Sequence, residues 1–183
     1  TLFMSISIDE LLRKIIHHIP VDKRERESIA TFLSVVPTLR DPFNEHADPV
    51  HVTASGILVS DDGAMTALHL HKRLGMWLQP GGHIKPGESP ADGALREAVE
   101  EIGVPARHES GGGLLFHVDV HPGPKGHTHL DLRYLLRAPQ VTPQPADGES
   151  TRVGWFGWAE AQSMADAGLV GALRAARALL GMA

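Results

Sequence analysis

Cysteine, long apolar runs and an excess of positive charge are all missing from this chain of 183 residues. Without cysteine the chain has no disulfides, no thiolate metal sites and no cysteine nucleophile. No stretch approaches the roughly 20 apolar residues that span a bilayer. The first residues become charged too early for a signal-peptide core. We therefore expect a cytoplasmic protein without a membrane segment.

The net charge is −5 with histidine neutral, which argues against a general affinity for nucleic acid. Apolar residues make up 42% and charged residues 21%, and both fractions are ordinary for a soluble globular protein. This length suits one domain with an arm and allows a substantial core. The sequence contains no internal repeat.

Residues 1–45 are predicted to form a helical arm. Ser7 with Glu10, and Asp22 with Glu25, resemble capping boxes, and a proline follows each expected helix. The first helix has a broad apolar face that must pack against something. The arm therefore packs against the main domain or joins a second copy of the chain in a homodimer.

The rest of the chain, residues 46–183, is predicted to form the main domain. Strands are expected over 51–60, 64–71, 114–121 and 127–138, with a short strand near 153–158 that enters a helix. The C-terminal residues are rich in Ala and Leu and should form an amphipathic helix.

The most informative segment is a glycine-rich loop that leads into a helix with three carboxylates on one face. Ser89 suits the cap, Pro90 the first helical position and Gly103 the end. The helix positions then place Glu97, Glu100 and Glu101 together, opposite an apolar stripe. A hard divalent cation would relieve the repulsion between these like charges. The alternative is a solvated acidic helix face.

Residues 82–104 resemble the Nudix box at every defined position. Gly82, Glu88, the pair Arg96-Glu97, the pair Glu100-Glu101, and Gly103 stand at the spacing of that motif. The resemblance implies an α/β (α+β) fold, a Nudix-type α/β/α sandwich with a mixed sheet, over residues 46–183. It also implies a metal-dependent pyrophosphohydrolase that uses Mg²⁺ or Mn²⁺. Such an enzyme cleaves the phosphoanhydride of a nucleoside diphosphate linked to another moiety.

The resemblance also assigns roles to single residues. The metal ligands would be Glu97, Glu100, Glu101 and the backbone carbonyl of Gly81. Glu88 and Arg96 would form an orienting pair that ties the loop to the helix. Two residues compete for the general base, since Glu97 could act as the base and Glu149, in the loop before the Trp155-Phe156 strand, could be a further ligand or base.

Histidines and one tryptophan are further candidates for substrate contact. His69 and His71 alternate on one predicted strand, and His127, His129 and Asp131 on another, so each group shares a face. These groups, with His83, could contact phosphates or hold a transition metal. The alternative is a solvated strand face. Trp77 could stack on a base or pack in the core.

The substrate stays open among nucleotide derivatives, because no subfamily motif is present outside the box. The Nudix-fold isoprenoid isomerases need a catalytic cysteine, which this chain lacks. The rival function is a Nudix-fold module that senses a nucleotide without cleaving it. Such modules typically lose box carboxylates, and this chain keeps all four.

Overall fold

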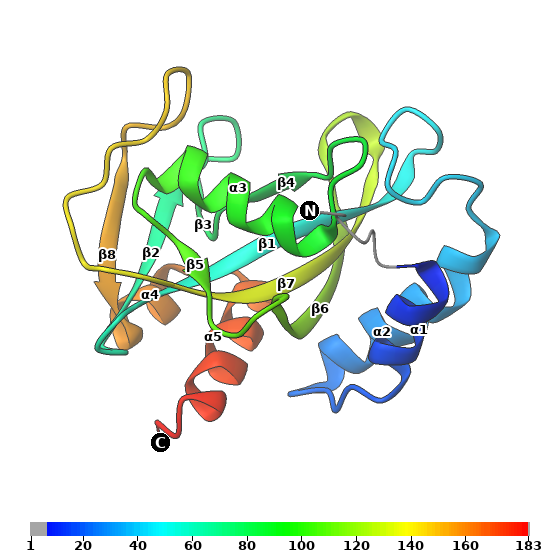
Figure 1. Ribbon diagram of the computed structural model, residues 1–183, viewed down its shortest axis with the longest axis horizontal. Helices are drawn as coiled ribbons and strands as arrows, with labels where there is room; N and C mark the ends of the chain where they lie inside the picture. Colours follow the sequence, from blue (N-terminus) through cyan, green and yellow to red (C-terminus); the bar gives the residue numbers. More distant parts are fainter. Residues whose placement is uncertain (1–6, 183) are drawn as a thin grey trace.

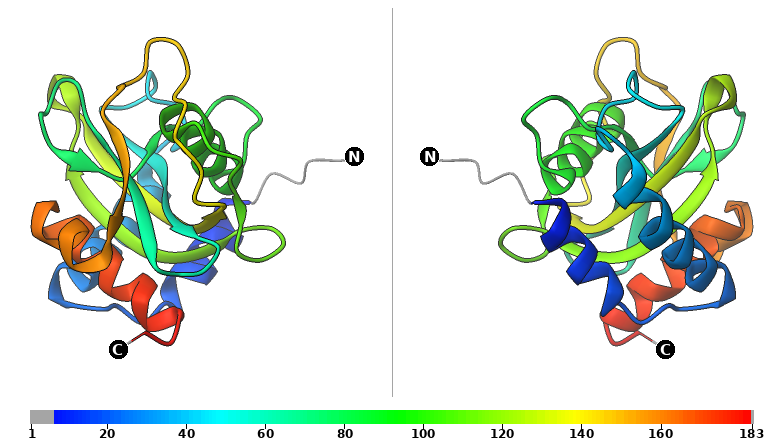
Figure 2. Two further views of the ribbon diagram at one scale, coloured as in Figure 1. Left: turned by 90° about the vertical axis from the view of Figure 1, so that its left-hand side faces the viewer. Right: turned by 90° about the vertical axis from the view of Figure 1, so that its right-hand side faces the viewer.

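The computed structural model describes residues 7–182, which form an open mixed sheet with helices on both faces (Figure 1). Helix α3 (Pro90–Ile102) lies on one face. Helices α4 (Trp158–Met164) and α5 (Ala167–Leu179) lie on the other. Figure 2 shows the sheet between these two helical layers. The predicted α/β/α arrangement is confirmed.

Strand β1 (Val50–Ser60) forms the centre of the sheet. It pairs in parallel along its whole length with β7 (Thr128–Ala138). Its other edge is shared between two antiparallel strands, β4 (Gly81–His83) near its start and β2 (Met65–Leu70) near its end. The divided edge places the glycine-rich loop, which contains β4, beside the middle of the sheet.

The remaining strands complete the two sides of the sheet. β6 (Leu114–Pro122) and the short β5 (Arg107–His108) pair with β7. β3 (Trp77–Leu78) and β8 (Val153–Gly157) pair with β2. The four long predicted strands are confirmed. The sequence did not predict β3, β4 or β5, and the turn between β6 and β7 contains the 3-10 turn η2 (Pro124–Gly126).

The N-terminal arm contains α1 (Ile8–Ile16), α2 (Lys23–Val35) and the 3-10 turn η1 (Val36–Thr38). Ser7 and Asp22 cap the two helices as predicted. The first helix ends at Ile16, four residues before Pro20. Leu11, Ile15 and Phe32 are fully buried in the same apolar cluster as residues of the sheet, so the arm packs against the main domain. The division at residue 45 and the homodimer stay predictions.

Helix α2 covers the free edge of β6. The N–H of Val118 donates to Oε1 of Glu25 at 3.0 Å, and the N–H of Val120 donates to Oγ of Ser28 at 3.1 Å. The Glu25 carboxylate also accepts from the N–H of Val21 and contacts the His18 ring. Two backbone groups that an edge strand leaves unpaired are thus satisfied by side chains of the arm.

A buried ion-pair layer lies on the face of the sheet toward α5. Arg133, which is 2% exposed, donates to Asp131 at 3.0 Å, to Asp119 at 3.2 Å and to the Gly168 carbonyl at 2.7 Å. The hydroxyls of Thr53 and Ser55 donate to Asp131. Each buried charge in this layer therefore has partners, which buried charges require.

Among the described residues, the helices are too short or too polar to span a membrane.

Candidate active site

Local signals fix the position of the carboxylate helix α3. The Ser89 hydroxyl accepts from the N–H of Asp92 at 3.1 Å, and Gly103 ends the helix with φ +73°. Ala94, Ala98 and Ile102 are fully buried. The helix therefore buries one face against the sheet, and its carboxylates lie beside β4.

Glu101 is the most perturbed of these carboxylates. Its Oε2 accepts from the N–H of Gly81 at 2.8 Å and lies 3.7 Å from Nε2 of His69. Burial raises the pKa of Glu101 to about 8, and the negative charges of Glu97, Glu149 and Glu100 act in the same direction. In the part of the chain that the structure describes, no Lys or Arg forms an ion pair with it.

Glu97 and Glu100 differ in their surroundings. Glu97 lies against the Gly82 backbone, where an added Cβ would be 2.6 Å from Oε1. Burial raises the pKa of Glu97, and its contact with Arg96 opposes that shift. Glu100 is more exposed and contacts both Arg96 and Lys85. The box glycine thus leaves room for a carboxylate between the loop and the helix.

Arg96 and Glu88 connect the loop to the helix. Nε of Arg96 donates to Oε1 of Glu88 at 2.9 Å, and Nη2 donates to Oε2 at 3.0 Å. Nη2 also donates to the His83 carbonyl at 2.9 Å, while Nη1 donates to Glu97 and Glu100. A bidentate pair of this kind fixes orientation as well as charge. These contacts have the arrangement that the resemblance implied for an orienting pair.

The loop that carries Glu149 crosses the C-terminal end of α3. The N–H of Gln144 donates to the Gly103 carbonyl at 3.1 Å, and that of Ala146 donates to the Glu100 carbonyl at 2.8 Å. Lys72 donates to the Gly148 carbonyl. The charge of Glu149 contributes to the raised pKa of Glu101, so the loop brings this glutamate to the carboxylate side of the domain.

Three of the residues suggested for substrate contact lie near β2 and β3. His69 is buried beside Glu101, and burial lowers its pKa to about 4, so its ring is neutral. The ring of His71 lies 6.0 Å from that of His69. Trp77 packs against Phe156, with ring centroids 4.9 Å apart, in an apolar cluster. Of its two predicted roles, the geometry favours core packing.

His83 and His129 lie in a different group, with His51. The rings of these three histidines have centroids 5.1 to 5.4 Å apart. Asp131 lies two residues further along β7 and is bound to Thr53, Ser55 and Arg133. The set of His127, His129 and Asp131 therefore does not converge on one point. Sequence analysis did not single out His51, because only the parallel pairing of β1 with β7 brings this residue beside His129.

The NUDIX domain family model matches residues 49–175, which is more than half of the chain. The chain belongs to the Nudix superfamily. A "Probable DHNTP pyrophosphohydrolase" of Lactococcus lactis subsp. cremoris is 30% identical over 105 residues, which are 54% of this chain and 60% of that protein. The match thus spans less than two thirds of this relative.

Solved Nudix structures have the same fold. A NUDIX-family hydrolase from Clostridium perfringens is 27% identical, with a TM-score of 0.58 over 70% of this chain and 97% of that one. An Ap4A hydrolase from C. elegans, in a binary complex, is 21% identical, with a TM-score of 0.60 over 71% of this chain and 97% of its own. The second likeness supports the fold alone.

Proposed function

We propose that this Nudix protein hydrolyses a phosphoanhydride bond in a nucleoside diphosphate linked to another moiety, with the help of Mg²⁺ or Mn²⁺. The observation that carries the proposal is the convergence of Glu97 and Glu101 on the Gly81–Gly82 backbone, with Glu100 joined to Glu97 through Arg96. The pyrophosphohydrolase name of the Lactococcus lactis relative points to the same reaction class.

The donor set suits a hard divalent cation. Its ligands would be the carboxylate oxygens of Glu97, Glu100 and Glu101 and the carbonyl of Gly81, because Mg²⁺ and Mn²⁺ prefer oxygen. Arg96 already balances part of the charge of Glu97 and Glu100, whereas Glu101 is paired with no cationic Lys or Arg among the described residues. When bound, such a cation neutralises phosphate charge and lowers the pKa of water.

Residues of the chain itself would position the carboxylates and the attacking water. Arg96, held by Glu88, keeps the glycine-rich loop in a constant position relative to the carboxylates of α3. Either Glu97 or Glu149 would accept the proton of the attacking water, since both lie on the carboxylate side of the domain. His69 is buried and neutral, and it would pack beside Glu101 without adding a positive charge.

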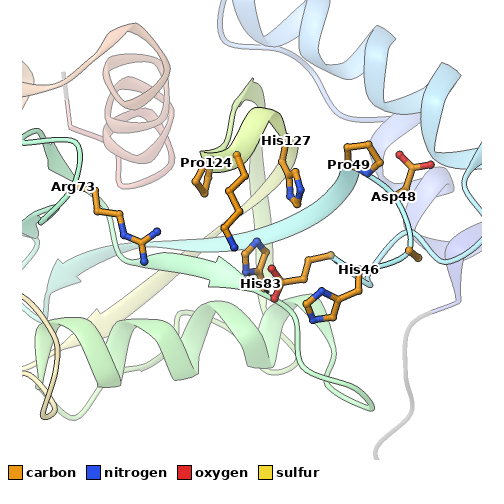
Figure 3. A pocket seen from close by; sticks show the side chains of 10 residues that line it. His46, Asp48, Pro49, Arg73, His83, Pro124 and His127 are labelled. Carbon is orange, nitrogen blue, oxygen red and sulfur yellow. Dashed lines mark ion pairs between the residues drawn. The ribbon is translucent and has the colours of Figure 1, made fainter.

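A cavity of about 560 Å³ lies beside the loop and is a candidate for the substrate's phosphates. Its lining includes the cationic side chains of Arg73 and Lys125, which suit a phosphate, and also the carboxylates of Glu45 and Asp48. Of the residues that the sequence suggests for substrate contact, His83 and His127 line this cavity. Figure 3 shows His83 and His127 in the middle of the lining, with Arg73 at one end and His46 and Asp48 at the other.

A phosphate-release screen of nucleoside diphosphate derivatives, with Mg²⁺ or Mn²⁺ and with chelator as the control, tests this function. We expect at least one compound to be turned over in a metal-dependent manner. Saturable binding of a nucleotide without turnover of any compound would contradict the proposal. That result would support the rival function, a nucleotide-sensing module.

A further inference from the structure

Three histidines from three different strands bring their ring nitrogens together outside the carboxylate site. His51 is on β1, His83 on β4 and His129 on β7, and one ring nitrogen of each lies within 4.8 Å of the other two. His51 and His129 are direct neighbours in the parallel ladder. His83 faces Thr53 on the other edge of β1, so the central strand unites the set.

Neighbouring oxygen atoms favour one tautomer in two of the rings. Nδ1 of His51 lies 3.2 Å from the Asp48 carbonyl oxygen, and Nδ1 of His83 lies 3.3 Å from a carboxylate oxygen of Glu45. Only a protonated nitrogen can donate to such oxygens. In the neutral rings Nε2 is therefore the atom with a free lone pair. A carbonyl or carboxylate behind a metal-binding histidine orients the ring in this way.

The Nε2 atoms of the three histidines are buried and have no hydrogen-bond partner in the structure. Burial lowers the pKa values of His51 and His129 and thus favours the neutral ring, the form that binds metal. The space at Nε2 of His129 is open because residue 123 is glycine. A Cβ at Gly123 would lie 2.4 Å from this nitrogen.

We propose that His51, His83 and His129 bind one transition-metal ion of the Zn²⁺ type, in addition to the hard cation at the box carboxylates. Imidazole nitrogen is a preferred ligand of Zn²⁺, whereas Mg²⁺ prefers oxygen. Around a tetrahedral Zn²⁺ with bonds of about 2.1 Å, ligand nitrogens are about 3.4 Å apart. The ring nitrogens lie within 4.8 Å of one another, so binding would require the rings to move closer together.

Three protein ligands leave one coordination position for water or for an oxygen of a bound molecule. His83 also lines the cavity that holds Arg73 and Lys125, so a molecule with a phosphate in this cavity lies next to the centre. The ion would also join β1, β4 and β7. It would thereby fix β4, whose glycines touch Glu97 and Glu101.

The test uses tag-free, chelator-treated full-length protein in excess Mg²⁺, titrated with Co²⁺ as a coloured probe for Zn²⁺. We expect one equivalent of Co²⁺ to give the visible spectrum of a nitrogen-ligated site, and Zn²⁺ to displace it. Loss of a residue that only supports a metal ligand lowers metal affinity by about 10- to 100-fold. Loss of a ligand itself should lower the affinity further. His83→Gln and His129→Gln should therefore each weaken Co²⁺ binding by more than about 100-fold.

Two controls separate this centre from other sites. His108→Gln removes a histidine whose buried ring nitrogens also lack partners but which lies outside the triad, and it should leave Co²⁺ binding unchanged. A Glu100→Gln/Glu101→Gln double variant should likewise keep the Co²⁺ spectrum. Gly123→Ala keeps all three histidines but fills the space at His129, so it should weaken binding.

Several results would overturn the proposal. They are the absence of a saturating Co²⁺ spectrum in the wild type, a spectrum that survives His83→Gln, or one that disappears only in the double carboxylate variant. His83 is partly exposed, with 36% of its side-chain surface accessible, so His83→Gln should fold normally. Circular dichroism of each variant verifies that lost binding does not reflect lost folding.

Discussion

The carboxylate of Glu101 lies between the N–H of Gly81 and the imidazole of His69, and burial raises its pKa to about 8. A neighbouring cation would favour the charged form and restore its usual acidity. This residue therefore has the most to gain, in electrostatic terms, from a metal ion. At neutral pH the metal-free protein carries Glu101 mainly in its protonated form.

The first prediction is that Glu101→Gln lowers kcat by about 10²–10⁴-fold, as loss of a major electrostatic or acid–base group does. The shape of the side chain is kept, and the amide can still accept from Gly81. The fold should therefore be retained. Steady-state kinetics on the best substrate measure the effect. Turnover close to wild type in saturating Mg²⁺ would remove Glu101 from the proposed site.

The same variant also reports on metal binding. Ligands that bind only the folded state stabilise it, by about 2.7 kcal/mol at 100 times the dissociation constant. Mg²⁺ should therefore raise the melting temperature of the wild type more than that of Glu101→Gln. Thermal melts with Mg²⁺ against chelator make the comparison. Equal shifts would place the stabilising cation elsewhere.

Arg133 holds two buried carboxylates, Asp119 and Asp131, on neighbouring strands. Arg133→Met keeps the volume but leaves both of these charges without their arginine. We predict a loss of about 3–5 kcal/mol in the free energy of unfolding, as for other broken buried pairs. Urea denaturation measures it. A loss below about 1 kcal/mol would mean that Arg24 and the hydroxyls of Thr53 and Ser55 already suffice for the two carboxylates.

At the scale of elements, Gly103 links α3 to the loop that carries Glu149. It has φ +73°, and a Cβ there would lie 1.9 Å from backbone atoms of Gln144. Only glycine satisfies both conditions, since the left-handed conformation is unfavourable for other residues. The C-terminal cap of the helix therefore also determines where the Glu149 loop crosses it.

We predict that Gly103→Ala destabilises the protein by about 2–4 kcal/mol, because left-handed strain and a steric overlap add together. Gly75→Ala is the matched control. Gly75 also has positive φ but has no atom within 4 Å of its added Cβ, so only the strain of about 1–2 kcal/mol should appear. Chemical denaturation of the two variants distinguishes them. Equal losses would mean that the loop moves aside without cost.

The sequence alone was sufficient to predict those helices and strands whose signals lie within the element itself. The caps of α3 at Ser89 and Gly103, and the alternating strands β6 and β7, follow from residues within a few positions of each other. The two-residue strands β3 and β5 are too short to produce a periodic pattern. The triad of His51, His83 and His129 depends on the register of strands distant in sequence, which no local pattern specifies.

At the scale of the whole molecule, buried histidines make stability depend on pH. Burial lowers the pKa values of His69, His117 and His129 to about 4 from 6.5. Between these values the unfolded chain binds more protons, so stability falls as the pH decreases, by at most about 1.4 kcal/mol per unit for each group and by less for the partly exposed His129. Glu101 acts in the opposite sense above pH 4.5, because its pKa is raised to about 8. Because three histidines act against one glutamate, the net effect is a loss of stability as the pH decreases.

We therefore predict that the urea midpoint of the metal-free protein falls as the pH is lowered from 6.5 to 4. His117→Gln should reduce this slope, because His117 is almost completely buried. His17→Gln, which changes an exposed residue, should not. Denaturation at a series of pH values measures both slopes. An unchanged slope in His117→Gln would show that His117 is protonated in the folded protein.

The contact between α2 and the edge of β6 has a consequence for how the chain can be divided. Glu25 and Ser28 occupy N–H groups that would otherwise be free to pair with a strand of another molecule. A fragment that began at β1 would retain the box and every proposed metal ligand, yet it would have an open sheet edge. We expect the molecules of such a fragment to associate edge to edge, which the arm prevents by covering this edge.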